Sequence, residues 1–132
     1  MILYFLVGLG GALGSMARFW ASGLVASQIG ETFPWGTLVV NVTGSFIIGF
    51  VATLTGPDGR VFASSNSRQF ILTGICGGYT TFSSFSLQTL NLVRDGEWLR
   101  AGGNITGSVV TCLLAVWLGH LAAASLNQLK GS

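Results

Sequence analysis

The sequence predicts an all-helical (all-α) membrane protein of four transmembrane helices. Of its 132 residues, 50% are hydrophobic and only 8% are charged, against roughly 25% charged in a typical soluble domain. A soluble protein of this size has a large surface for its volume and needs polar side chains to cover it. The chain has six Lys and Arg residues and four Asp and Glu residues. We therefore expect the lipid bilayer to cover most of its outside.

Four stretches are long and apolar enough to cross a bilayer, which takes about 20 mostly apolar residues. They are residues 2–25, 36–55, 70–93 and 101–126. Turn-forming residues separate them, as in the run Gly56-Pro57-Asp58-Gly59. The first stretch lacks the basic beginning of a signal peptide and is longer than a signal peptide's apolar region, so we treat it as a span. We expect residues 1–132 to form one transmembrane domain.

Glycines are spaced for close helix packing in three of these spans. Gly10 and Gly14, Gly74 and Gly78, and Gly103 and Gly107 each form a GxxxG pair. Such pairs clear one stripe of a helix of side chains and let two backbones approach closely in lipid. Helix packing is the expected role of these pairs.

The positive charges predict no single orientation in the membrane. Four spans put Arg60, Arg68 and Lys130 on one side, and Arg94, Arg100 and Arg18 on the other. With three positive charges on each side, the positive-inside rule predicts no preferred orientation. Either the bias is too weak to read from one sequence, or molecules insert both ways and pair as antiparallel homodimers, with a two-fold axis in the membrane plane.

No group of residues predicts catalysis or a nucleic-acid partner. The acidic residues all fall in expected loops: Glu31, Asp58, Asp95 and Glu97. His120 is the only histidine, so neither a nucleophile–base pair nor paired carboxylates can be placed within the membrane. A net charge of +2 without a basic run argues against nucleic acid. Cys76 and Cys112 lie in apolar stretches, where thiols are typically small core residues.

The third span has a polar, glycine-rich middle, residues 74–86. Two adjacent glycines followed by two β-branched threonines make a poor helix. A helix broken within the bilayer is tolerated only where protein or a water-filled cavity shelters its freed carbonyls. Unwound carbonyls at that depth are good ligands for sodium. We expect a break at mid-membrane, with Gly77 and Thr80 presenting carbonyls near a dimer axis.

Candidate pore-lining residues occur on three spans. Phe82 and Phe85 are three residues apart and share a helix face, and the positive edges of aromatic rings can line a path for a small anion. The full candidate set is Asn41, Thr81, Phe82, Ser83, Ser84, Phe85, Asn104, Ser108, Thr111 and Cys112. Packing of the phenylalanines and hydrogen bonding between helices are the open alternatives. Arg18 either stands at a vestibule that attracts anions or extends to the lipid headgroups.

Two motifs carry a resemblance to a known family. They are Gly36-Thr37-Leu38-x-x-Asn41 and Gly77-Gly78-x-Thr80-Thr81-Phe82-Ser83-x-Phe85-Ser86. With the length and the four spans, they resemble the Fluc, or CrcB, family of small bacterial fluoride channels over essentially the whole chain. The resemblance implies a passive, fluoride-selective channel of the bacterial inner membrane that lowers cytoplasmic fluoride and protects the cell from its toxicity.

The resemblance also implies an assembly and a cofactor. Family members are dual-topology antiparallel homodimers with two pores, and each pore receives phenylalanines from both subunits. A structural sodium ion (Na+) lies at the dimer interface, bound by backbone carbonyls that match Gly77 and Thr80. Gln88 stands where many members have a glutamate, Asn104 where the family usually has an aromatic or other polar residue, and Cys112 where a hydroxyl is common, so the roles of these positions are not carried over.

Two other functions are compatible with parts of the sequence. The size and the balanced charges suit a coupled exporter of small cations or drugs, but such an exporter needs a titratable group within the membrane, and none of the acidic residues lies there. The GxxxG pairs alone would suit a non-transporting packing subunit of a larger complex.

Overall fold

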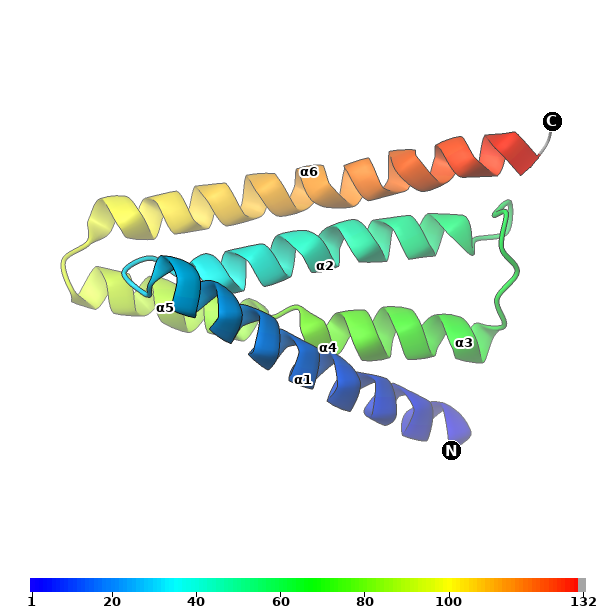
Figure 1. Ribbon diagram of the computed structural model, residues 1–132, viewed down its shortest axis with the longest axis horizontal. Coiled ribbons are helices and arrows are strands. Elements are labelled where there is room, and N and C mark those ends of the chain that lie inside the picture. The colour runs from blue at the N-terminus through cyan, green and yellow to red at the C-terminus, as the bar shows by residue number, and fades with distance from the viewer. Residues whose placement is uncertain (131–132) are drawn as a thin grey trace.

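The computed structural model describes residues 1–130, and these residues form only helices and loops, without a strand. The three long helices are α1 (Ile2–Ile29), α2 (Trp35–Leu54) and α6 (Trp98–Lys130). Between α2 and α6 lie α3 (Ser65–Gln69), the π-helix η1 (Phe70–Cys76), α4 (Gly77–Tyr79) and α5 (Phe82–Arg94). Figure 1 shows α2 and α6 side by side, the succession from α3 to α5 alongside α2, and α1 crossing obliquely. The all-helical prediction is confirmed over the described residues.

Three of the predicted spans are continuous helices of sufficient length and apolarity to cross a membrane: Ile2–Ile29, Trp35–Leu54 and Trp98–Leu129. α1 runs past the predicted end at Val25 because the polar residues there are compatible with a helix. It ends where Gly30 takes a positive φ of 101°, a conformation that terminates helices. The third predicted span differs from the others because it consists of consecutive helical pieces, of which the longest, α5, has 13 residues.

Backbone contacts between glycines hold α1 against η1 and α4. A Cβ atom at Gly10 would lie 2.6 Å from the carbonyl oxygen of Phe70, and one at Gly78 would lie 2.6 Å from that of Gly11. A Cβ atom at Gly14 would collide with the carbonyl oxygen of Ile75. The first two GxxxG pairs therefore pack against each other, as the sequence predicts.

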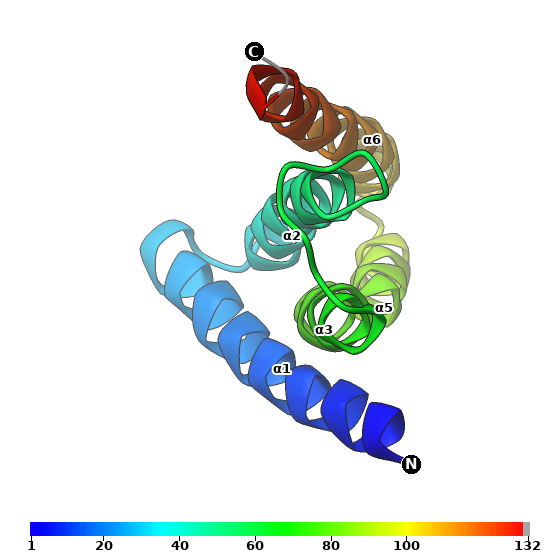
Figure 2. The same ribbon diagram turned by 90° about the vertical axis from the view of Figure 1, so that its right-hand side faces the viewer.

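The fourth span packs through a different glycine from the predicted ones. Gly119 on α6 faces α2 so closely that a Cβ atom would collide with the carbonyl oxygen of Phe46. Around Gly103 and Gly107, by contrast, nothing among the described residues lies within 4 Å of the Cβ position. GxxxG spacing indicates where a backbone can be approached, but the neighbouring helix decides which glycines are used. Figure 2 shows α6 next to α2 and on the far side of α2 from α1.

The outer surface of the helices is apolar. Large side chains stay exposed on α1 and α6, among them Phe19 (82% exposed), Trp20 (69%) and Leu113 (64%). An apolar surface of this extent on a soluble protein would be an aggregation liability. It agrees with a multi-pass membrane protein.

We predict that Gly14→Ala destabilises the fold, because the new methyl group must push η1 away from α1. Such overpacking costs about 1–3 kcal/mol. The control is Gly8→Ala on the same helix, where nothing lies within 4 Å of the Cβ position. Thermal unfolding in detergent measures both. Equal midpoints for the two variants would contradict the close packing of α1 on η1.

Candidate functional site

The third predicted span is interrupted at two threonines. Helix α4 ends at Tyr79, and Thr80 (φ −88°, ψ 157°) and Thr81 (φ −151°, ψ 121°) are extended before α5 begins at Phe82. β-branched residues favour this conformation. Gly77 and Gly78 remain helical. The predicted break is present, but the threonines rather than the adjacent glycines leave the helix.

Asn41 on α2 binds the backbone of Thr81 in both directions. Its Nδ2 donates a hydrogen bond to the Thr81 carbonyl oxygen at 2.9 Å, and its Oδ1 accepts one from the Thr81 N–H at 2.8 Å. The interrupted helix leaves both of these backbone groups without helical partners. One side-chain amide satisfies both, and Asn41 thereby stabilises the break.

The break releases the two carbonyls that the sequence singled out. In a continuous helix the N–H groups of Thr81 and Ser84 would bond to the carbonyls of Gly77 and Thr80. Here the Thr81 N–H bonds to Asn41, and the Ser84 N–H bonds to Thr81 Oγ1 at 3.1 Å. The carbonyl of Gly78 is bound separately, by Arg18 Nε at 3.0 Å. The carbonyl oxygens of Gly77 and Thr80, which flank Gly78 and Tyr79 in the sequence, are thus left without these helical partners.

An outer cavity of about 770 Å³ lies between the second half of α1, the start of α2 and α5. Arg18, Thr81, Ser84 and Gln88 line its inner part. The Oε1 atom of Gln88 is buried and has no hydrogen-bond partner among the described residues. The Arg18 guanidinium lies at this cavity, bound to an interior carbonyl, and its vestibule role stays a prediction.

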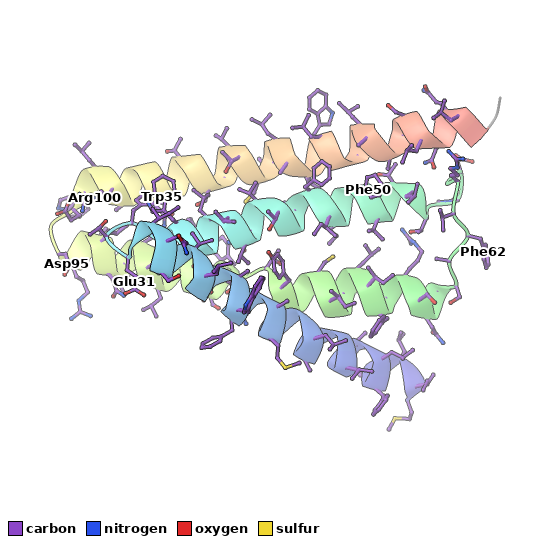
Figure 3. All side chains as sticks on the ribbon, viewed as in Figure 1. Glu31, Trp35, Phe50, Phe62, Asp95 and Arg100 are labelled. Atoms are coloured by element: carbon purple, nitrogen blue, oxygen red, sulfur yellow. The ribbon has the colours of Figure 1, made fainter. Side chains whose placement is uncertain are left out.

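Loop residues form the mouth of the outer cavity. Glu31 comes from the α1–α2 loop, and Asp95, Glu97 and Arg100 come from the α5–α6 connection and the start of α6. Figure 3 shows Glu31, Asp95 and Arg100 gathered at one end of the molecule, with Phe62 at the opposite end. Arg100 is paired with Glu97 at 3.8 Å, a distance and exposure at which an ion pair contributes little.

An inner cavity of about 350 Å³ is bounded by α2, the break, α5 and α6. Seven of the predicted site residues line it: Asn41, Thr80, Thr81, Phe82, Phe85, Ser108 and Cys112. Thr81 lines the outer cavity as well. The two cavities therefore share a lining residue at the break in the third span.

The two phenylalanines contact each other but differ in burial. Their ring centroids are 5.3 Å apart, with the ring planes tilted by 52°. Phe85 is 9% exposed, whereas Phe82 is 75% exposed. The shared helix face is confirmed, and Phe82 projects from the surface of the single chain.

The polar residues of α6 divide into two groups. Asn104 is buried and donates to Thr89 Oγ1 at 2.9 Å, while Ser108 Oγ donates to Asn104 Oδ1 at 3.3 Å. Asn104 therefore links α6 to α5 and does not line either cavity. Thr111 is exposed and bonds to the carbonyl of Gly107 in its own helix.

Two serines lie differently with respect to the cavities from what the sequence predicts. Ser83 is exposed and lines neither cavity, although its hydroxyl lies 3.2 Å from that of Thr81. Ser45 was not predicted, yet it lines the inner cavity. The available signal was its spacing of four residues from Asn41, which puts both on one face of α2.

Comparison with known proteins identifies the family of this chain. Residues 5–120 match the family described as CrcB-like protein, Camphor Resistance (CrcB). The chain belongs to the CrcB-like family. This CrcB-like chain is 69% identical to a protein of Opitutus terrae over the whole of both chains. It is 60% identical to one of Methylocella silvestris over 98% of both chains, and 60% identical to one of Rhodospirillum rubrum over 95% of this chain and 97% of that protein. Each of these relatives is named "Fluoride-specific ion channel FluC".

We predict that Asn41→Leu, which keeps the branched shape of the side chain and removes the amide, destabilises the break. It leaves two backbone groups of Thr81 unpaired, and each costs about 1–3 kcal/mol. The measurement is amide hydrogen exchange of Thr81, which should become faster. Asn66→Leu in the exposed helix α3 is the control. Unchanged exchange at Thr81 in Asn41→Leu would show that the amide does not stabilise the break.

Proposed function

We propose that this CrcB-like protein is a passive, fluoride-selective ion channel and not an enzyme. The observation that carries the proposal is that Thr81 at the break lines both cavities, in a chain whose relative over its full length is named a fluoride-specific ion channel. Fluoride is small and accepts strong hydrogen bonds. A path for it has to replace lost water with donors and positive ring edges.

The residues along the two cavities supply such groups in order. The Arg18 guanidinium in the outer cavity raises the local anion concentration. The hydroxyls of Thr81 and Ser84 come next, followed by the rings of Phe82 and Phe85 in the inner cavity, whose edges carry partial positive charge. Ser108 on α6 lines the inner cavity as well, with its hydroxyl hydrogen-bonded to Asn104. Ser83, Thr111 and Asn104 have supporting positions beside this path.

The transmembrane domain of the proposal comprises residues 1–132, of which 131–132 lie outside the described residues. In it, the pieces from α3 to α5 act together as a fourth span, broken at mid-membrane. The bonds from Asn41 and Arg18 to the backbone beside the break support this assignment, because an interrupted helix within lipid needs every freed polar group sheltered.

The working unit of the proposal is an antiparallel homodimer of dual topology with two pores. Phe82, 75% exposed in one chain, lies against the partner and contributes to a shared pore wall. The equal division of positive charges supports insertion in both orientations. An isologous interface satisfies both copies with one set of contacts.

The released carbonyls are the proposed binding site of a structural sodium ion. The Gly77 and Thr80 oxygens are uncharged, hard donors at the break, and two copies around a two-fold axis would offer twice that number. Within the described residues there is no group of three or more His, Cys, Asp or Glu that could bind a metal ion, so the backbone is the donor set that suits this ion. When bound, sodium would balance the field of anions in the pores.

Passive transport follows from where the acidic residues lie. All four Asp and Glu residues fall outside the helices, so no carboxylate is placed to carry protons through the membrane. This argues against the coupled exporter. A passive channel in the bacterial inner membrane lets fluoride leave the cytoplasm down its own gradient.

We predict that Phe82→Ile abolishes most fluoride flux, since an aliphatic side chain has no positive edge. A reduction of about a hundredfold would correspond to about 2.8 kcal/mol of lost stabilisation of the anion in the path. Fluoride efflux from liposomes, followed with a fluoride electrode, measures it. Phe62→Ile, which changes a 93% exposed loop residue, should behave as the unmodified protein. An active Phe82→Ile channel would remove the aromatic pair from the mechanism.

Dual topology predicts that a carboxyl-terminal tag is accessible from both sides of the membrane. In sealed vesicles, about half of the tags should react with an impermeant reagent, and the rest only after permeabilisation. The purified particle should contain two chains. Reaction of all tags from one side would contradict the antiparallel dimer while leaving the pore residues untested by this measurement.

A further inference from the structure

Arg68 on α3 ties the beginning of the third span to the end of α2. Its Nε donates a hydrogen bond to Thr55 Oγ1 at 3.0 Å, and its Nη2 donates one to the Ala52 carbonyl oxygen at 3.1 Å. Ala52 belongs to the last turn of α2, and Thr55 follows that turn directly. A cation is favoured there because the last carbonyls of a helix have no partner within it. The half-buried Arg68 side chain therefore fixes α3 to α2.

The third span is thus held on α2 at two levels. At the break Asn41 binds Thr81, and thirteen residues earlier in the sequence Arg68 binds the end of α2. On α2 the two levels, Asn41 and Ala52, are eleven residues apart, a fixed distance of about 16 Å in a continuous helix. The third span covers the same interval with η1 as its longest piece, and Figure 1 shows it alongside α2.

The conformation of η1 depends on how its two ends are held. π-helices are rare and occur mostly as single turns, so a π-helix of seven residues needs support from its surroundings. Towards α1 this support is a contact between the backbones of Gly10 and Gly74, which offers no side chains that interlock. The break end has a second tie to α2, because Thr43 Oγ1 lies 2.9 Å from the Tyr79 hydroxyl. The beginning of the span depends on Arg68.

We propose that Arg68 is a positioning residue for the fluoride path, because it holds η1 in the π-helical form and thereby sets where the backbone of the break lies. The inference rests on the proposed channel function. Arg68 lines neither cavity, so it acts through η1 and not on the anion. Gly77 follows η1 directly. Without the two hydrogen bonds of Arg68, η1 converts to an α-helix, and the carbonyls of Gly77 and Thr80 turn with it.

The test replaces Arg68 by Met, which keeps an unbranched side chain and removes the guanidinium. Amide hydrogen exchange of Thr81 should become at least about fivefold faster, because the break opens more often once one end of the span is free. In liposomes the ratio of fluoride to chloride flux should fall by at least about tenfold, since small displacements of positioned groups are costly. Loss of folded protein lowers both fluxes together, so the ratio reports position and not stability.

Asn127→Leu is the matched control, because Asn127 makes two hydrogen bonds at the same end of α2 but belongs to α6. Its Nδ2 donates to the Thr53 carbonyl oxygen at 3.1 Å, and its Oδ1 accepts from the Arg60 N–H at 2.6 Å. We expect this variant to unfold at a lower temperature in detergent and to keep both the exchange of Thr81 and the flux ratio.

Thr55→Val serves if Arg68→Met does not fold, since it removes one of the two acceptors and leaves Arg68 in place. It should change both readouts in the same direction as Arg68→Met, by a smaller factor. Unchanged exchange of Thr81 or an unchanged flux ratio in the folded variant would overturn the proposal.

An equal fall of the flux ratio in Asn127→Leu would also overturn it, because general weakening of this end of the molecule would then be the cause. Absence of fluoride flux through the unmodified protein would instead refute the channel function. In that case the exchange of Thr81 in Arg68→Met would still decide whether Arg68 positions the break.

Discussion

The pair of hydrogen bonds between Asn41 and the backbone of Thr81 is the interaction on which the rest of the structure depends. In hydrocarbon an unpaired backbone N–H or C=O is too costly to leave, and continuous helices are the usual solution. This chain interrupts a helix and satisfies the freed groups with side chains. Asn41 binds Thr81, Arg18 binds Gly78, and the Thr81 hydroxyl binds the Ser84 N–H. The carbonyls of Gly77 and Thr80 lose their helical partners, and the proposed sodium ion would bind to them.

The glycines determine whether those side chains can reach the break. Gly14 lets α1 approach η1, and Arg18 follows one turn later on the same face, so its guanidinium arrives beside Gly78. On α2, a Cβ atom at Gly44 would collide with the methyl group of Thr80. Gly44 is three residues from Asn41, so the helix face that binds the break is also the face that makes room for it. One face of α2 therefore provides both the close packing against the break and the hydrogen bonds to its backbone.

Much of this arrangement follows from the sequence, and the exceptions have physical reasons. Hydropathy predicted four spans, and three of them are continuous helices, because length and apolarity decide membrane crossing. Low helix propensity predicted that the third span would break, but not where. Gly78 stays helical because it packs on Gly11, and the extended conformation passes to the threonines. Propensity indicates where a helix is weak, and packing decides which residue leaves it.

The sequence also could not predict which of the individual pore candidates face a cavity. Asn41, Phe85 and Ser108 line the inner cavity as their polarity or spacing suggested, whereas Thr111 and Ser83 do not. Composition cannot fix the rotation of a helix about its axis to within one residue. Asn104 illustrates the alternative role, since it links two helices. Phe82 lines the inner cavity and is nevertheless 75% exposed, a difference from Phe85 that the spacing could not predict.

The central claim is that the path through the break selects fluoride. The most direct measurement compares fluoride with chloride flux through the same reconstituted protein at equal gradients. A path built from hydroxyl donors and ring edges should pass fluoride and almost exclude the larger, more weakly hydrogen-bonding chloride. Equal flux of the two anions would contradict the account.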